Sequence, residues 1–350
     1  MVLDRLLIFD FRIFAKLELG LHPGMNFLIG CNGQGKTTIL EAVCVLLRLQ
    51  SPRTYSLLRC VRLGAESFLL RGLYGGEVMQ VCFREGRKEF LLDGKVPGST
   101  GEYLAVGKVV WMSASDNELV KGPAAARRRF LDFLGAQCVT GYLKQLRAYE
   151  KALRSRNALL KAGAGWREVR AFDGPLCEAG NFLTSARFKL VVALVPIARK
   201  FCGMIGMGDG DLELVYVASV SGEMEEALEA KWALEQRVRT TVVGPHRDEL
   251  EIKLGGWSAS EFCSEGQQRT LALALKLAQG EILGYELGRP PIYLIDDVFG
   301  ELDEERRNNL MKILPVEAQK LITSTSLSWL SGVMFEGQIF EVSQGEVREV

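Results

Sequence analysis

The sequence has few of the residues that build metal centres or disulfide frameworks. Its 350 residues include only two histidines, His22 and His246, which lie too far apart along the chain to suggest a metal centre. Eight cysteines are scattered along the chain, and no two of them have C-x-x-C spacing. This pattern argues against a disulfide framework or a zinc site and favours reduced thiols in a cytoplasmic protein.

Long hydrophobic runs and a signal peptide are also missing. The best candidate for a membrane span, residues 190–195, is short and is followed by Pro196. The N-terminus carries charge at Asp4 and Arg5 and continues as strand-like sequence, which does not fit a signal peptide. We therefore expect no membrane-spanning helix and no membrane partner.

The chain has no excess of charge of one sign, because 43 Lys and Arg balance 43 Asp and Glu. The charges are unevenly placed: residues 121–170 hold twelve basic and three acidic side chains, a local excess of nine positive charges. Such asymmetry indicates a local patch for a polyanion. The length allows two compact domains, or one domain with a large insertion.

A phosphate-binding loop is the strongest feature that is present. Residues 30–37, Gly-Cys-Asn-Gly-Gln-Gly-Lys-Thr, match G-x-x-x-x-G-K-[ST] between an apolar strand-like segment and a helical one. In this arrangement backbone N–H groups and the helix dipole bind phosphate, while Lys36 reaches the outer phosphates and Thr37 ligates Mg²⁺. The predicted nucleotide-binding residues are Gly30, Cys31, Asn32, Gly33, Gln34, Gly35, Lys36, Thr37 and Thr38.

A second signal is the apolar segment 292–295, which ends in Asp296 and Asp297. An apolar strand followed by acids is the second half of a phosphate-loop ATPase site. We expect Asp296 to hold Mg²⁺ and Asp297 to orient or deprotonate the attacking water, so that Asp297 and Lys36 are the predicted catalytic residues. The alternative is an ordinary strand that ends in an acidic turn.

Residues 264–269, Ser-Glu-Gly-Gln-Gln-Arg, precede an apolar helix. A Ser and a Gly at a helix N-terminus can bind an anion, or Ser264 can simply cap the helix, and the two roles are compatible. The S-x-G-Q core resembles the signature motif of ABC-type ATPases, which faces the nucleotide held by a second copy. The resemblance implies that Ser264, Gly266 and Gln267 act in trans and that Asp303 lies in an interface loop.

The order of patterns predicts an α/β protein. Residues up to about 112 are strand-like, with antiparallel hairpins over 66–93. Helical patterns cover 124–162 and 175–205, with Pro196 as a kink or boundary. Mixed helix and strand patterns return after residue 260. We expect an ABC-ATPase-type P-loop head, a mixed sheet with flanking helices plus an antiparallel β-subdomain, formed by residues 1–112 and 246–350. A mainly helical arm, residues 113–245, would interrupt it.

The arm contains the basic excess. On a helical wheel the apolar residues of 142–160 share one face, and a basic stripe covers the adjacent face. The stripe and a preceding triplet are the candidate DNA contacts: Arg127, Arg128, Arg129, Lys144, Arg147, Lys151, Arg154 and Lys161. The alternative is a solvated helix face. Because no aromatic residues interleave the stripe, duplex backbone contact is favoured over base stacking.

Several strings together resemble the RecF family of bacterial recombination and gap-repair ATPases. They are residues 33–37, 119–123 (Leu-Val-Lys-Gly-Pro), 127–132 (Arg-Arg-Arg-Phe-Leu-Asp), 243–248 (Val-Gly-Pro-His-Arg-Asp), 267–274 (Gln-Gln-Arg-Thr-Leu-Ala-Leu-Ala) and 296–303 (Asp-Asp-Val-Phe-Gly-Glu-Leu-Asp). The resemblance implies weak ATPase activity with ATP and Mg²⁺, an ATP-dependent homodimer that clamps duplex or gapped DNA, and roles in recombinational repair and the SOS response. It also implies partnership with recombination mediator proteins and a RecA-type recombinase.

Three departures from related patterns affect this interpretation. Glu265 stands where the family usually has Gln, and Gly300 where it usually has Ser. Transporter-type ABC domains place a His after the last core strand, where this chain has Thr323, Ser324 and Thr325. The missing His counts against the nucleotide-binding subunit of an ABC transporter and fits slow hydrolysis. The signature-like motif counts against a small-molecule P-loop phosphotransferase.

The string His246-Arg247-Asp248 allows two interpretations. Arg247 could contact DNA or lie at the junction between arm and head. We favour a structural cluster in which Asp248 pairs with Arg247 and His246 is satisfied internally.

Overall fold

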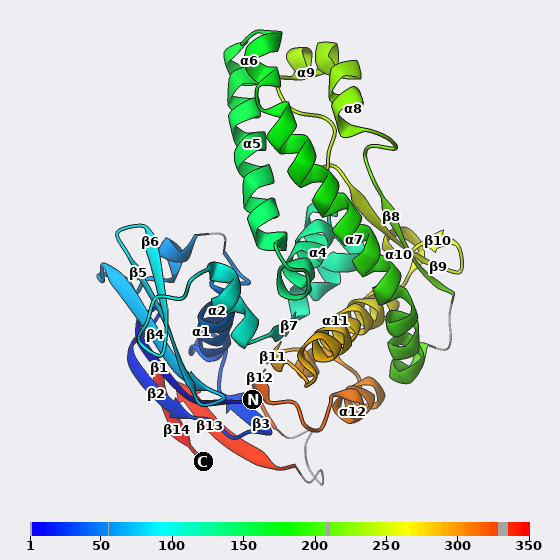
Figure 1. Cartoon of the computed structure of the whole chain (residues 1–350). Helices are drawn as coiled ribbons and strands as arrows, with labels where there is room; N and C mark the ends of the chain where they lie inside the picture. The colour runs from blue at the N-terminus through cyan, green and yellow to red at the C-terminus, as the bar shows by residue number, and fades with distance from the viewer. Residues whose placement is uncertain (1, 55, 208–210, 328–334) are drawn as a thin grey trace. The chain divides into compact units, whose positions relative to one another are not determined.

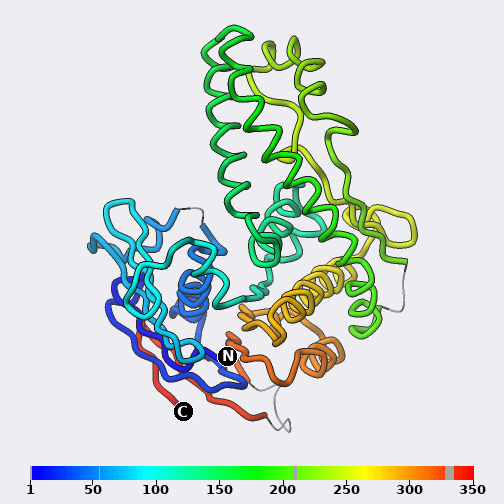
Figure 2. Tube along the Cα trace, in the orientation of Figure 1, coloured from blue at the N-terminus to red at the C-terminus, as the bar shows by residue number. Residues whose placement is uncertain are grey.

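The computed structural model of the protein describes residues 2–54, 56–207, 211–327 and 335–350. Its contacts divide the chain into two compact units. Unit 1 comprises residues 1–116, 204–206 and 276–350, and unit 2 comprises residues 117–203 and 207–275. Both ends of the chain therefore belong to unit 1 (Figure 2).

The main sheet of unit 1 has the strand order β14-β13-β3-β12-β11-β7. Its strands are β3 (Met25–Ile29), β7 (Val109–Ser113), β11 (Ile292–Asp296), β12 (Lys320–Ser324), β13 (Gly337–Ser343) and β14 (Glu346–Glu349). All neighbouring pairs are parallel except the β13–β14 hairpin. Apolar runs such as Leu294-Ile295 and Leu321-Ile322 are fully buried, as parallel strands covered on both faces require.

A second sheet of unit 1 is antiparallel, with the order β2-β1-β4-β5-β6. Its strands are β1 (Leu3–Phe11), β2 (Phe14–Gly20), β4 (Ser67–Tyr74), β5 (Glu77–Arg84) and β6 (Arg87–Leu92). The strands alternate between buried and more exposed residues, the pattern of a sheet with one face in the core. The hairpins expected over 66–93 are confirmed.

Helix α1 (Lys36–Arg48) packs against both sheets, with contacts to β4 and β5 of one and to β7 and β11 of the other (Figure 1). Residues 39–47 of α1 are almost all apolar and fully buried, because a helix between two sheets has no solvent face. Other helical segments of unit 1 are α2 (Thr100–Val106), α12 (Glu304–Ile313) and the short turns η1 (Leu57–Cys60), η2 (Ala114–Asn117, whose last residue belongs to unit 2) and η4 (Phe299–Glu301).

Unit 2 is built around two long helices, α5 (Tyr142–Ala162) and α7 (Asp173–Cys202), which pack along one another (Figure 1). Its shorter helices are α3 (Glu118–Lys121), α4 (Ala124–Cys138), α6 (Trp166–Arg170), α8 (Met224–Ala230), α9 (Trp232–Val238) and α10 (Ala259–Phe262). Its core contains Tyr149, Leu176, Leu183 and Leu228. The expected apolar face of α5 is thus confirmed.

Unit 2 also contains a small sheet with the order β10-β9-β8, and it extends further along the chain than the expected arm. The strands are β8 (Leu212–Val217), β9 (Glu249–Leu254) and β10 (Trp257–Ser258). Because β9 pairs with β8 and α10 packs against α3, residues after 245 join unit 2, and its boundary lies at 275/276 in place of 245/246. Helix α11 (Glu265–Leu287) begins in unit 2 and ends in unit 1.

Two helix expectations need correction. The helix expected over 124–162 is interrupted between α4 and α5: Val139 is extended after the end of α4, and Gly141, with φ of 80°, is the N-cap of α5. Pro196 does not end α7, which continues to Cys202 and into a π-turn, η3 (Gly203–Met207). Both Pro196 and the residue one turn before it, Val192, are exposed, so the hydrogen bond lost at proline faces water.

Within the described part of the chain, the segment Asp173–Met207 is long and apolar enough to cross a membrane by length and composition alone. One such helix is weak evidence for a membrane span, because the core helices of globular proteins pass the same test. Leu176, Leu183 and Leu190 of α7 are buried in unit 2.

Candidate functional site

The phosphate-binding loop lies at the carboxyl edge of the main sheet, between β3 and α1. Gly30, Gly33 and Gly35 have φ angles of 147°, 80° and 112°, which side-chain-bearing residues rarely adopt. A Cβ added at Gly35 would lie 2.6 Å from Ile13 Cδ1. The glycines are therefore required by the loop, and Cys31, Asn32 and Gly33 at its tip are exposed to solvent.

Lys36 is buried at the first turn of α1. Its Nζ donates hydrogen bonds to the carbonyls of Gly30 at 2.6 Å and Cys31 at 2.9 Å. Burial lowers the pKa of Lys36, and the negative charges of Asp297 and Asp296 oppose that shift. The ammonium group is thus held at the loop, close to two carboxylates, where an incoming polyphosphate would meet it.

Asp296 lies at the end of β11, and one of its carboxylate oxygens accepts hydrogen bonds from two hydroxyl groups. Thr37 Oγ1 donates to Oδ1 at 2.7 Å and Thr323 Oγ1 donates to the same atom at 2.9 Å. Burial raises the pKa of Asp296, whereas the hydroxyls of Thr37 and Thr323 lower it. The pairing of a phosphate-loop hydroxyl with the acid of the second motif is the juxtaposition that the sequence predicted.

The donor set fits a magnesium ion that is completed by phosphate. Thr37 and Asp296 offer one hydroxyl and one carboxylate, hard oxygen ligands of the kind that Mg²⁺ prefers together with water and phosphate oxygens. Among the described residues no group of three His, Cys, Asp or Glu side chains could hold a metal by itself. The site therefore suits an ion that arrives with a nucleotide.

Asp297 follows directly and has a left-handed backbone, with φ of 55°. Its N–H donates to Thr323 Oγ1 at 2.9 Å, so Thr323 orients both acids of the pair. Non-glycine residues in this conformation are uncommon and cluster at functional sites. The hydroxyl of Thr323, in the segment 323–325 where a transporter-type His was expected, thus contacts both acids directly.

The residues of the signature-like motif lie in unit 2. Ser264 Oγ accepts the N–H of Gln267 at 3.3 Å, and Gln267 Oε1 accepts the N–H of Ser264 at 2.9 Å. This reciprocal pair is a capping box, so the capping role considered for Ser264 is present. Ser264 and Glu265 are exposed and Gly266 is half-buried. Glu265 is therefore placed as a solvent-facing residue.

Asp303, the expected interface-loop residue, lies in unit 1. It caps α12, because its carboxylate accepts the N–H of Arg306 at 2.9 Å and forms an exposed ion pair with the same residue. Its side chain is 55% exposed, which leaves it accessible.

Residues 127–132 and residues 243–248, two of the strings that carry the family resemblance, meet in unit 2 and form a buried polar network. Arg127 is bidentate to Glu249, with Nε at 2.7 Å and Nη2 at 3.0 Å, and donates to the carbonyl of Gly122 at 2.8 Å. Arg128 donates to the carbonyl of Asp248 at 2.8 Å. Arg127 is only 13% exposed, so these contacts favour a structural role for it over a DNA contact.

The interior of this network is completed by Arg187, which is almost fully buried. It forms a bidentate ion pair with Asp132, at 2.8 and 3.0 Å, and donates to the carbonyl of Pro245 at 2.7 Å. Tyr142 also donates to Asp132, at 2.5 Å. The string at 127–132 and the string at 243–248 are therefore joined by hydrogen bonds inside unit 2.

The string His246-Arg247-Asp248 is structural at two of its three positions. Asp248 accepts the hydroxyls of Tyr216 and Thr184 and the N–H of Ser219. It does not pair with Arg247, which is exposed and donates to the carbonyl of Thr241, so the expected Asp248–Arg247 pair is wrong. The two side chains point to different partners because Asp248 is buried and Arg247 is not.

His246 is held in a neutral state. Its Nε2 lies 3.1 Å from the carbonyl of Thr241 and its Nδ1 lies 2.6 Å from Tyr149 Oη. A proton on Nε2 donates to the carbonyl, so Nδ1 accepts from the tyrosine. Burial, together with the nearby positive charges of Arg247 and Arg128, lowers the pKa of His246 to about 4.

The basic stripe lies on α5 and is open to solvent. All five of its members are exposed: Lys144, Arg147, Lys151, Arg154 and Lys161. Arg154 forms a loose ion pair with Glu150 at 3.7 Å, between two exposed side chains. Arg156, on the same helix, is instead fully buried between Asp173 and Glu235. The structure thus separates a solvent-facing stripe from one interior arginine.

Two further features of the site were missed by sequence reasoning. Glu41 is the only charged residue within the apolar run 39–47, which is the signal that could have revealed it. It is fully buried and accepts from Arg12 at 2.7 Å and from Ser51 at 2.5 Å. Gln34 of the phosphate loop accepts a hydrogen bond from the backbone of Gln344. The sequence signal that could have indicated a turn at Gln344 is the Gln344-Gly345 pair.

Comparisons with known proteins agree with this geometry. A family model described as an AAA domain matches residues 5–65, which include the phosphate loop. The chain is 32% identical to the "DNA replication and repair protein RecF" of Crocosphaera subtropica over 384 residues, with all of both chains covered. A solved structure of "the recombination mediator protein RecF-ATPrS in RecFOR pathway" is 31% identical, covers 99% of this chain and 98% of that one, and has a TM-score of 0.90.

The fold extends to more distant proteins. A solved Smc head bound to the C-terminal winged-helix domain of ScpA has a TM-score of 0.59 at 14% identity, which shows the fold alone. Together with the mixed sheet, its flanking helices and the antiparallel sheet, these likenesses confirm the expected α/β fold with a head of ABC-ATPase type.

Proposed function

The chain belongs to the RecF family, and from this we propose that it is an ATP-dependent DNA-binding protein that acts in recombinational repair of gapped or stalled replication DNA. The observation that carries the proposal is the meeting of Thr37 and Asp296 at one edge of the main sheet, 259 positions apart in the chain. A phosphate loop and a carboxylate in contact form the core of an ATPase site.

ATP binds at residues 30–38. The backbone N–H groups of the glycine loop and the N-terminus of α1 receive its phosphates, and Lys36 exchanges its loop carbonyls for phosphate oxygens. Thr37 and Asp296 would hold Mg²⁺, which when bound would neutralise charge on the phosphates. The exposed tip of the loop leaves room for the ligand.

Hydrolysis depends on Asp297. Its N–H donates to Thr323 Oγ1, and its negative charge opposes the lowering of the Lys36 pKa by burial. Asp297 orients the attacking water and accepts its proton. We expect weak turnover, because a threonine hydroxyl stands where a histidine would assist in transporter-type domains, and slow hydrolysis suits a protein that resets a clamp.

ATP also drives formation of a homodimer. The exposed Ser264, with Gly266 and Gln267, closes over the γ-phosphate held by a second copy, and the exposed Asp303 lies in the loop that crosses the interface. The capping box at Ser264 supports this role, because it presents the N-terminus of the long helix α11 in one defined geometry.

The dimer closes on DNA through unit 2. The exposed stripe Lys144, Arg147, Lys151, Arg154 and Lys161 contacts backbone phosphates, which need cations but no specific base. Arg128 and Arg129 are half-buried and contribute less, and Arg127 is occupied by Glu249. Closure positions the protein on duplex next to a gap.

In the cell the protein works in the cytoplasm with other recombination mediator proteins. It helps them load a RecA-type recombinase and thereby supports the SOS response. The full-length likeness to RecF proteins disfavours both alternatives, a transporter subunit and a small-molecule phosphotransferase.

Light scattering with ADP, with ATP, and with ATP plus gapped duplex tests this proposal. We expect a monomer with ADP, a dimer with ATP, and a larger protein–DNA complex only when ATP and DNA are both present. A protein that stayed monomeric with ATP, or that bound DNA equally with ADP, would contradict the clamp.

A further inference from the structure

Gln34 lies in the glycine-rich part of the phosphate loop. It lies between Gly33 and Gly35, whose φ angles of 80° and 112° are accessible mainly to glycine. Glycine loses more conformational freedom on ordering than any other residue. A loop with this composition needs contacts from elsewhere to hold one conformation before a ligand arrives.

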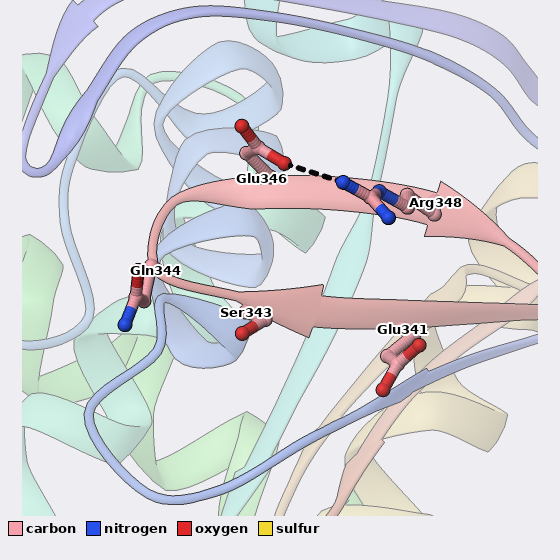
Figure 3. A pocket seen from close by; sticks show the side chains of 5 residues that line it. All are labelled: Glu341, Ser343, Gln344, Glu346 and Arg348. Atoms are coloured by element: carbon pink, nitrogen blue, oxygen red, sulfur yellow. Dashed lines mark hydrogen bonds and ion pairs between the residues drawn. The ribbon is translucent and has the colours of Figure 1, made fainter.

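One such contact comes from the C-terminal hairpin. The N–H of Gln344 donates to Oε1 of Gln34 at 2.5 Å, across 310 positions of sequence. Figure 3 shows Gln344 at the turn of the hairpin, beside the loop that leads into α1. The acceptor is a side chain and the donor is backbone, so the bond depends on the shape of the turn and not on the side chain of residue 344.

The topology explains why the turn arrives there. Strand β13 is parallel to β3, with Glu341 paired to Ile29, so both strands end at the same edge of the sheet. The two turn residues, Gln344 and Gly345, have φ of 51° and 80°, as in the tightest hairpin turns. The hairpin also approaches the loop closely at Gly30, where an added Cβ would clash with the carbonyl of Val342.

The outer side of the hairpin is open. Ser343, Glu346 and Arg348 are exposed and, with Glu341 and Gln344, line a shallow pocket of about 390 Å³ (Figure 3). The Glu346–Arg348 ion pair at 3.0 Å is exposed as well and contributes little. The turn is therefore held on its inner side, where it meets the phosphate loop.

We propose that the β13–β14 hairpin positions the phosphate loop, and that the Gln344–Gln34 hydrogen bond pre-orders it for the phosphates of the nucleotide. This inference rests on the proposed ATP site. Pre-ordering lowers the conformational cost of binding in the ground state and the transition state alike. Loss of the bond therefore raises KM and leaves kcat unchanged, which marks Gln344 as a positioning residue and not a catalytic one.

Two substitutions break the bond from opposite sides. Gln344→Pro removes the donor and cannot adopt the positive φ, whereas Gln34→Leu removes the acceptor at similar size and leaves the hairpin untouched. Gln344→Asn is the matched control, because it keeps the N–H and tolerates the left-handed conformation. ATP and ADP binding by calorimetry, steady-state kinetics and thermal unfolding are measured for each variant and for the double variant Gln34→Leu/Gln344→Pro.

We expect each single variant to bind ATP about tenfold more weakly, equivalent to about 1.4 kcal/mol, and the double variant to be no weaker than the weaker single one. Gln344→Asn should bind like the unaltered protein. Wild-type affinity of Gln34→Leu, or additive losses in the double variant, would overturn the inference while leaving the ATP site in place. Failure of the unaltered protein to bind ATP would instead overturn the proposed function, and this inference with it.

Discussion

Thr37 and Asp296 share a hydrogen bond of 2.7 Å between Oγ1 and Oδ1, although 259 positions separate them. Burial lowers the pKa of the neighbouring Lys36, and the negative charge of Asp297 opposes that shift. Two adjacent pairs from distant segments therefore form one site at the carboxyl edge of the main sheet.

Lys36→Met should abolish ATP-dependent dimerisation, because it removes the ammonium group that the loop presents to the phosphates. Light scattering with and without ATP measures the effect. Lys95→Met, which alters an exposed lysine of unit 1, is the control and should dimerise normally. A Lys36→Met protein that still dimerised with ATP would rule out the assigned site.

Asp297→Asn should trap the ATP-bound dimer. The amide keeps the shape of the side chain but cannot accept a proton from water, so kcat should fall by about 10²–10³ while ATP binding persists. Single-turnover hydrolysis and light scattering measure these two effects. Asp4→Asn, at an exposed aspartate of β1, is the control. Unchanged turnover in Asp297→Asn would remove this residue from the mechanism.

Charge reversal of Arg147, Lys151 and Arg154 to Glu should weaken DNA binding and flatten its salt dependence. If each side chain contacts one phosphate, the slope of log K against log salt should shrink by about 3. Fluorescence anisotropy of labelled gapped duplex over a salt series gives both quantities. Reversal of Arg84, Arg87 and Lys95, exposed residues of unit 1, is the matched control. Retained affinity and slope in the first variant would place the DNA contact elsewhere.

The protein should lose stability in mild acid through His246. Its folded pKa of about 4 lies below the ordinary value of 6.5, so the unfolded chain binds the proton more readily. The contribution is fully present above pH 6.5 and is lost as pH falls toward 4. Between about pH 7.5 and about pH 5 the loss should be about 2 kcal/mol. Urea unfolding at both values should show a smaller loss in His246→Gln, and equal losses would contradict the neutral, buried histidine.

Arg156→Met should destabilise unit 2 strongly. The substitution leaves Asp173 and Glu235 buried without their cation, which typically costs about 3–5 kcal/mol. Arg154→Met, two positions away and exposed, should cost less than about 1 kcal/mol. Thermal unfolding of the two variants makes the comparison on one helix, and equal effects would show that the buried triad is unimportant for stability.

The contrast between Arg154 and Arg156 shows where sequence patterns stop being informative. Both belong to the same basic excess, but a spacing of two residues puts them about 200° apart on a helix, on opposite faces. The periodicity therefore separates the two side chains without telling which partners the inward-facing one meets. Burial distinguishes them, because Asp173 from α7 and Glu235 from α9 reach only one of the two. In the same way Arg127 matched a DNA-contact pattern but pairs with Glu249, 122 positions later.

The sequence by itself determined the phosphate loop, the acid pair and the head fold. These features are local: contiguous N–H groups bind phosphate, glycines permit the loop's φ angles, and parallel apolar strands must end at a common edge. Tertiary structure alone decided which charges are free. It also placed the turn at Gln344 against Gln34, ended unit 2 at Leu275 and turned Asp248 away from Arg247. The physical reason is that hydrogen-bond partners and burial come from segments distant in the chain, and no local pattern specifies which of them will meet.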